Sequence, residues 1–301
     1  MSTNVTLLSK KLSDAYKAAC LAELEALKPG NVHIFADGHG MKVQDFIKSA
    51  EASCAVIAQD HLSVGERVYK AIEATNRAVG LNTNLGLVLL YAPLLHSYLN
   101  MSANPSRSEF IPCFSKQLEH TLSLLSEEDG ARVASAIVLA NPAGLGNVSE
   151  NDVHDSPKVT LLEMMRSAQH KDKIAWQYTN NFSDILVFGL TKYEQAIAKW
   201  QALTNNRRQN ETWATTALYL SFLANQLDSH VLRKHGEALA KQLMQEALEI
   251  EALFWSADNP KLVQKHLLAW DASLKSRNIN PGTSADLIVA CLMVRNFEEI
   301  V

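Results

Sequence analysis

The chain has 301 residues, and its 28 lysines and arginines are outnumbered by 32 aspartates and glutamates, which gives a formal net charge of −4. This balance gives no reason to expect a nucleic-acid-binding protein, since such proteins are usually basic. Hydrophobic residues make up 47% of the chain, which excludes a disordered protein. With only 12 glycines and 8 prolines, the composition favours helices joined by short connections.

Helical patterns follow one another along the chain. Residues 63–66 (SVGE) form a capping box, Gly80 is placed to end the helix that follows, and residues 160–163 (TLLE) repeat the box. No segment shows the sustained alternation of apolar and polar residues that marks a strand. We predict one all-α, bundle-like domain over residues 1–301, with loops at 28–42, 100–110 and 141–157. Its helices, about twelve in number, are predicted at 5–27, 43–59, 63–79, 84–99, 111–123, 127–140, 158–171, 182–203, 210–226, 230–254, 259–276 and 283–298.

The sequence shows no sign of export or of membrane insertion. Met1 to Leu12 lacks an apolar stretch, and the longest apolar run, Leu85–Leu95, is too short to cross a bilayer. Four cysteines without a CxxC pair fit a reducing compartment, where they would behave as small core residues. They are Cys20, Cys54, Cys113 and Cys291. We therefore expect a cytoplasmic protein with no membrane partner.

Glycine gathers with polar residues in three places, and the first follows the first predicted helix. In residues 28–33 (KPGNVH), the proline ends the helix and Gly30 permits a turn that other residues resist. Lys28 places a cation beside the exposed amides of Gly30 and Asn31, which suits a phosphate. The alternative is a helix stop followed by a solvated loop.

The second place is residues 80–86 (GLNTNLG), which run directly into an apolar helix. Asn82 or Thr83 can cap this helix, and its free amides and positive dipole end, next to Asn84, could then hold an anion. Gly86 in the first turn lets a ligand or another backbone approach closely. The alternative is an ordinary cap with a glycine needed for packing.

The third place is residues 280–287 (NPGTSADL), at the start of the last helix. After the turn at Gly282, Thr283 or Ser284 can cap that helix. Asp286 falls in its first turn, where a carboxylate could simply favour the helix dipole. It could instead bind Mg²⁺ carried by phosphates, because Mg²⁺ commonly takes one or two carboxylates plus phosphate oxygens.

Three glycine-bearing loops that each adjoin a helix end could together build a polyphosphate pocket at one end of a bundle. Neither GxxxxGK[ST] nor GxGxxG occurs, so the pocket would not be one of the common nucleotide-binding loops. The interpretation requires Gly30, Gly86 and Gly282 to meet around one cavity.

Two further segments could line such a pocket. Residues 172–182 carry Trp176, Tyr178 and Phe182, which could flank a nucleobase or could belong to the core. Residues 228–233 could form a wall of the site or be a helix cap followed by surface charges.

The three loops resemble motifs of the triphosphoribosyl-dephospho-CoA synthase family. That family has a KPG turn after its first helix, a GxNTHKG segment and a PGGSADL-like segment near its C-terminus. Here they stand as KPG at 28–30, GLNTNLG at 80–86 and PGTSADL at 281–287, in the same order and over nearly the whole chain. The resemblance implies an all-α fold, in agreement with the helical patterns.

The resemblance also implies a reaction. A ribose 2′-hydroxyl of dephospho-CoA attacks C1′ of ATP, adenine leaves, and the triphosphate stays on the transferred ribose. By this analogy Lys28, Gly30, Asn31, the helix start at 82–86 and residues 282–284 hold phosphates. Asp286 holds Mg²⁺ or acts as the base. We expect ATP with Mg²⁺ and a small-molecule acceptor as ligands, no nucleic acid, and a homodimer.

The sequence departs from the family at two positions, because Asn84 and Leu85 stand where the family has His and Lys. His39 and Lys42 could replace the missing cations, and we assign His39 a catalytic role beside Asp286. Two alternatives stay open. The chain could act on a precursor in methanopterin- or methanofuran-linked one-carbon cofactor biosynthesis, or it could bind a nucleotide without catalysis.

Overall fold

Helices dominate the computed structural model, which describes residues 2–101, 105–141, 158–203 and 206–300. Within these ranges there are fourteen α-helices and no strand; two isolated bridges, His33–Ala36 and Gly38–Met41, shape the loop after the first helix. The predicted all-α class is confirmed. The α-helices are α1 (Ser2–Glu25), α2 (Val43–Ile57), α3 (Val64–Val79), α4 (Leu85–Leu99), α5 (Phe110–Ser123), α6 (Glu127–Ala140), α7 (Leu161–Ala168), α8 (Lys173–Thr179), α9 (Leu190–Trp200), α10 (Arg207–Asn225), α11 (Ser229–His235), α12 (Glu237–Ser256), α13 (Gln264–Ser276) and α14 (Gly282–Ile300).

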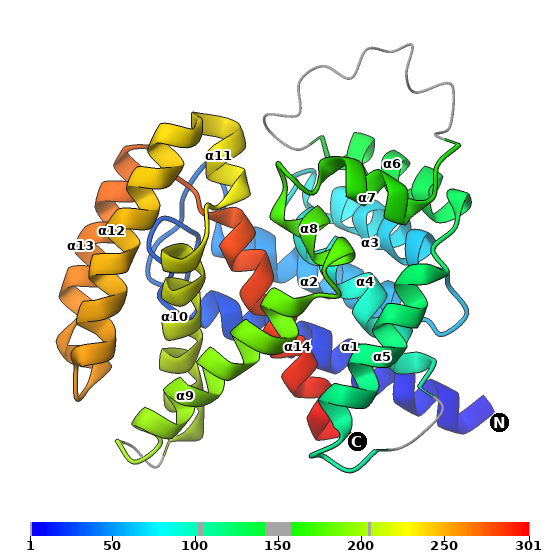
Figure 1. Ribbon diagram of the computed structural model, residues 1–301, viewed down its shortest axis with the longest axis horizontal. Helices are drawn as coiled ribbons and strands as arrows, with labels where there is room; N and C mark the ends of the chain where they lie inside the picture. The colour runs from blue at the N-terminus through cyan, green and yellow to red at the C-terminus, as the bar shows by residue number, and fades with distance from the viewer. Residues whose placement is uncertain (1, 102–104, 142–157, 204–205, 301) are drawn as a thin grey trace.

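The first and last helices, α1 and α14, pack against each other in the middle of the molecule (Figure 1). Helices α2 to α8 gather on one side of this pair, and α9 to α13 gather on the other. Helix α4 is apolar around its whole circumference, and eleven of its fifteen residues are buried, as expected for a helix in the centre of a core. The run Leu85–Leu95 is therefore a core helix, and no helix of the described residues is long and apolar enough to cross a membrane.

Three predicted segments divide differently from the prediction. The predicted helix 230–254 breaks at Gly236, whose φ of +85° ends α11 before α12 begins. The predicted helix 182–203 begins as a π-helical segment (Asp184–Gly189) and continues as α9, and the short helix α8 before it was not predicted. The predicted helix 259–276 begins as a 3₁₀ turn at Pro260–Leu262, and α13 follows this turn.

Helices α3 and α6 begin at one shared junction, which is built around Asp129. One carboxylate oxygen of Asp129 accepts hydrogen bonds from the Ser63 hydroxyl and the Gly65 amide, both at 2.7 Å. The other oxygen accepts from the amide and hydroxyl of Ser126, at 3.0 and 2.8 Å. Burial acts to raise the pKa of Asp129, but these hydrogen bonds outweigh it and hold the pKa below its usual value. The predicted capping boxes at Ser63 and Thr160 are both confirmed.

Other predictions about the core can be checked within the described residues. Tyr178 and Phe182 are buried in the core, as the core interpretation of residues 172–182 requires, while Trp176 is half-buried beneath the ammonium of Lys173. All four cysteines are free, and Cys20 and Cys291 are buried. Of the predicted loop 141–157, residues 142–157 lie outside the described residues, as do 102–104 of the loop 100–110.

Candidate active site

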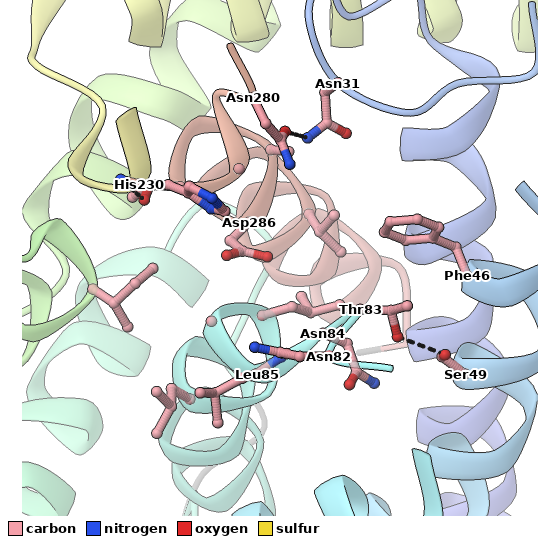
Figure 2. A pocket seen from close by; sticks show the side chains of 18 of the residues that line it. Asn31, Phe46, Ser49, Asn82, Thr83, Asn84, Leu85, His230, Asn280 and Asp286 are labelled. Carbon is pink, nitrogen blue, oxygen red and sulfur yellow. Dashed lines mark hydrogen bonds between the residues drawn. The ribbon is translucent and has the colours of Figure 1, made fainter. Parts of the chain in front are cut away.

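A cavity of about 530 Å³ opens between the N-terminal ends of α4 and α14 and the loop that follows α1 (Figure 2). This volume lies within the range of small-molecule binding sites. The side chains that line the cavity come from α1, α2, α4, α6, α7, α8, α11 and α14, so residues from both ends of the chain share it.

The three glycine-bearing loops meet at this cavity. A side chain at Gly30 would contact Pro281 at 2.9 Å, and one at Gly282 would contact the imidazole of His230 at 2.8 Å. A side chain at Gly86 would collide with the carboxylate of Asp286. Each glycine is therefore needed for close approach between segments far apart in the sequence. Gly86 and Gly282 line the cavity themselves, and the first loop reaches it through Asn31 and His39 rather than through Gly30.

The predicted site residues divide into two groups. Three of them, Lys28, Gly30 and Ser284, do not line the cavity. The others do, namely Asn31, His39, Asn82, Thr83, Asn84, Gly86, Gly282, Thr283 and Asp286.

Lys28 differs most from its predicted role, because its ammonium group is completely buried. It donates hydrogen bonds to the carboxylate of Glu23, to Asn31 Oδ1 at 2.9 Å and to the carbonyl of Val32 at 2.6 Å. Burial lowers the pKa of Lys28 and raises that of Glu23, and the attraction between the two charges opposes both shifts. All three donors are used within the protein, so Lys28 holds the turn and does not face a phosphate.

Gly30 and Ser284 also serve the structure around the cavity. The amide of Gly30 donates to Asp271 Oδ1 at 2.8 Å. The amide and hydroxyl of Ser284 both donate to Asp228 Oδ2, at 2.8 and 2.9 Å. Because Asp228 Oδ1 also accepts from the Val231 amide, this one carboxylate joins the starts of α11 and α14. The alternative of a helix cap at residues 228–233 is confirmed, and the same segment still lines the cavity through His230 and Arg233.

Asp286 projects from α14 into the centre of the cavity and lies against Gly86 in the first turn of α4 (Figure 2). Burial raises its pKa well above the usual value, and repulsion from Glu23, Asp228 and Asp172 adds to this. A hydrogen bond from the Leu87 backbone acts in the opposite direction. No cationic side chain forms an ion pair with Asp286 among the described residues. No positive charge of the protein therefore offsets the free-energy cost of ionising this carboxyl group, which leaves it able to bind a ligand or to take up a proton.

The position of Asp286 changes the predicted phosphate site at 82–86. The positive end of α4 was predicted to face an anion from a ligand. The structure places a carboxylate of the protein there instead, and a bare phosphate next to it would be repelled. Asn82 Oδ1 accepts from the Leu85 amide at 3.2 Å, which confirms the predicted cap of this helix.

His39 lies at the mouth of the cavity with a φ of +57°, a conformation that side chains other than glycine rarely adopt. Both ring nitrogens have partners, Nε2 with the Gly30 carbonyl at 2.7 Å and Nδ1 with Asn278 Oδ1 at 3.2 Å. His39 therefore fixes the loop to the turn after α13, and its catalytic role remains a prediction.

Neutral polar side chains form the wall opposite the mouth. Thr83 donates to Ser49 at 2.6 Å, and Asn84 donates through Nδ2 to Thr75 at 2.9 Å. The other amide atom, Asn84 Oδ1, is buried without a hydrogen-bond partner. Asn84 stands where the resemblance expects a histidine and has no charge at any pH, so this wall can exchange hydrogen bonds but supplies no cation.

Sequence reasoning missed two charged residues of the site, Lys234 and Glu23. Lys234 lines the cavity from the last turn of α11, next to Arg233 of the predicted wall at 228–233. Arg233 pairs with Asp172 at 3.2 Å, and Lys234 donates to Asn278 at 3.3 Å. The run of basic residues at 233–235 was the available signal. Glu23 had none, because a single glutamate inside a long amphipathic helix looks like any solvated residue.

His230 stands beside these cations and is neutral at physiological pH. Burial and the nearby charges of Arg233 and Lys234 lower its pKa to about 4. Its imidazole can therefore donate one hydrogen bond and accept another, but it adds no positive charge to the cavity.

The side chains that line the cavity include few possible metal ligands. No group of three or more His, Cys, Asp or Glu side chains that could hold a metal occurs among the described residues. A metal bound by the protein alone is thus not supported. The unpaired carboxylate of Asp286 does fit Mg²⁺ that arrives with a polyphosphate, which needs only one or two protein carboxylates.

The comparisons with known proteins agree with the geometry. The family model described as ATP:dephospho-CoA triphosphoribosyl transferase matches residues 9–301. Among solved structures, a candidate triphosphoribosyl-dephospho-CoA synthase from Archaeoglobus fulgidus is similar in fold, with a TM-score of 0.58 and 20% sequence identity. The match covers 84% of this chain and 96% of that one. No curated protein sequence matches the chain significantly.

Proposed function

We propose that this chain, which belongs to the ATP:dephospho-CoA triphosphoribosyl transferase family and is accordingly an enzyme, carries out the family's transfer in the cavity around Asp286. The donor would be ATP and the acceptor dephospho-CoA. The observation that carries the proposal is the half-buried carboxyl group of Asp286, which has no ion-pair partner among the described residues, in a cavity where all three glycine-bearing loops meet.

The chemistry requires one bond to form and one to break at C1′ of the ATP ribose. The 2′-hydroxyl oxygen of dephospho-CoA bonds to C1′, the bond from C1′ to the adenine nitrogen breaks, and the bonding electrons leave with adenine. The hydroxyl proton goes to a base, and adenine takes up a proton from solvent. Asp286 is the base we propose, because a raised pKa brings a carboxyl group closer to the pH at which proton transfer is most effective.

Two sets of residues would bind the triphosphate. Arg233 and Lys234 supply positive charge from α11. Asn82, Thr83 and Thr283 supply hydrogen-bonding groups from the ends of α4 and α14. Mg²⁺ bound with the nucleotide would neutralise phosphate charge. Asp286 would hold this ion only in place of acting as the base, because a bound cation removes the raised pKa on which the role as base depends.

A direct test is to incubate the purified protein with ATP, Mg²⁺ and dephospho-CoA and to separate the products by chromatography and mass spectrometry. The proposal expects free adenine together with dephospho-CoA that has gained the mass of a triphosphoribosyl group. The matched control is Ser167→Ala, which removes an exposed hydroxyl of α7 that does not line the cavity and should not change the rate. Tight ATP binding with no adenine release under any acceptor would contradict the proposal.

A further inference from the structure

The lining of the cavity is not chemically uniform. Asn31 and Asn280 lie on one side of Asp286, and Leu85 lies on the other together with Asn82 and Thr83 (Figure 2). The part that we call the apolar chamber lies where α8 packs against α4 and α7, and it is lined by side chains of these three helices. Its residues are Leu85, Leu89, Met164, Met165, Ile174 and Ala175.

We infer that the apolar chamber binds the adenine base of the donor nucleotide, an inference that rests on the proposed function. None of its six side chains carries a hydroxyl, amide or charged group, so neither a triphosphate nor a ribose would find hydrogen bonds there to replace those with water. The two faces of a flat heteroaromatic ring can pack against the two methionines, whose flexible thioethers adapt to aromatic surfaces. The polar edge of the ring would face the hydrogen-bonding groups that line the rest of the cavity.

The charged residue at the edge of the apolar chamber does not disturb this assignment. Asp172 Oδ1 accepts from the amides of Ile174 and Ala175, at 2.8 and 3.3 Å, and so caps α8. Asp172 Oδ2 accepts from Arg233 at 3.2 Å. Both oxygens are engaged at the entrance, which leaves the interior of the chamber apolar.

The place of the chamber favours the base of the donor over the apolar arm of the acceptor. The bond that breaks joins the base directly to C1′, so the base must lie within one bond of the reacting carbon. Asp286 lies against Gly86, and the neighbouring residues Leu85 and Leu87 both line the cavity. The chamber therefore begins at the carboxylate that we propose as the base.

The test fills the chamber while leaving the polar part of the cavity unchanged. Ala168 lines the cavity from α7 and is half-buried, so Ala168→Trp places a large ring in the space proposed for adenine. The matched control is Ser167→Trp, since Ser167 is the neighbouring residue on the same helix and is exposed to solvent. Binding of ATP, inorganic triphosphate with Mg²⁺ and dephospho-CoA is measured by calorimetry for wild type and both variants, with helical content checked by circular dichroism.

The inference expects Ala168→Trp to weaken ATP binding by about tenfold or more, the loss of roughly one buried apolar group, with less than about a twofold change for triphosphate and dephospho-CoA. Ser167→Trp should change none of the three. Should Ala168→Trp lose its helical content, Met164→Ala takes its place, with an expected weakening of ATP binding of about threefold or more.

Three outcomes would overturn the inference. They are unchanged ATP binding in a folded Ala168→Trp protein, weakening of dephospho-CoA in place of ATP, and equal weakening of all three ligands. The last would mean that the substitution distorts the cavity as a whole. Failure of the wild-type protein to bind ATP would contradict the proposed function as well, whereas ATP binding that ignores the chamber contradicts the inference alone.

Discussion

Two helix junctions in this molecule each place an aspartate against a glycine in the first turn of a helix, and folding shifts the pKa values of the two aspartates in opposite directions. At the α3–α6 junction, Asp129 lies against Gly65 in the first turn of α3; at the α4–α14 junction, Asp286 lies against Gly86 in the first turn of α4. Asp129 has four hydrogen bonds and a lowered pKa, whereas Asp286 has repelling carboxylates around it and a raised one. A carboxylate with four hydrogen bonds stabilises the fold, and one with a single backbone hydrogen bond and no ion pair is available for a ligand.

The largest expected effect comes from Asp286→Asn. Removing the proposed base should lower kcat about 10²- to 10⁴-fold, the usual contribution of a positioned base. The free energy of unfolding of the free protein should rise, because the variant no longer carries a buried carboxyl group among Glu23, Asp228 and Asp172. Adenine release and thermal unfolding of the same preparation measure both quantities. A less stable protein with full activity would mean that Asp286 is only a helix cap.

Asp129→Ala should give the opposite pattern. It leaves the Ser63 hydroxyl, the Gly65 amide and the Ser126 amide without their acceptor, which should lower the free energy of unfolding by about 2–4 kcal/mol. The activity per folded molecule should stay the same, because this junction does not line the cavity. Denaturant unfolding and the rate at a temperature well below the transition check this. A loss of activity without a loss of stability would remove the distinction between the junctions.

The paired variants Gly86→Ala and Gly65→Ala sharpen the comparison further. A methyl group at Gly86 meets the carboxylate end of Asp286, which can rotate away, so the free energy of unfolding should change little. The rotation displaces the proposed base, and a shift of about 1 Å can lower kcat roughly 10²-fold. A methyl group at Gly65 meets the backbone of Asp129, which cannot move, so this variant should lose about 1–3 kcal/mol of stability. If both variants lost stability alone, or both lost activity alone, Gly86 and Gly65 would serve the same purpose and the distinction between the two junctions would fail.

The smallest effect is the pH dependence of stability. The pKa of Asp129 is lowered by folding, so its contribution is present above the unfolded pKa of about 3.9 and is lost as the pH falls through the folded pKa. The pKa of Asp286 is raised by folding, so it reduces stability as the pH rises above about 3.9. Melting curves from pH 3 to 8 should therefore show the advantage of Asp286→Asn growing with pH. An advantage that is the same at pH 3 and pH 7 would contradict the raised pKa.

Much of the architecture could be predicted from local patterns. The helix at 127–140 has its cap, its acidic first turn and its apolar face within a few residues, and its predicted bounds agree with α6. The break at Gly236 was not predicted, because a single glycine in a long helical pattern is tolerated as often as it interrupts. The short helix α8 was hidden for a related reason: its cap, Asp172, precedes only seven helical residues.

The site was predicted in part. The loops could be named because glycine and asparagine are rare in helices, and each loop adjoins the cavity. The roles of individual residues depended on tertiary neighbours that no local pattern reveals. Lys28 pairs with Glu23 inside the protein, and the end of α4 is occupied by Asp286 from the other end of the chain. Spacing along the sequence carries no information about such pairs.

The central claim is that the unpaired carboxylate of Asp286 marks the place where the triphosphoribosyl group is handled. The most direct measurement is a crystal structure with ATP and Mg²⁺ bound and dephospho-CoA left out. The account predicts the ribose C1′ beside Asp286, with Mg²⁺ in contact with phosphate oxygens. A nucleotide bound outside this cavity, or a triphosphate that reaches Lys28 while Asp286 contacts neither metal nor ribose, would contradict it.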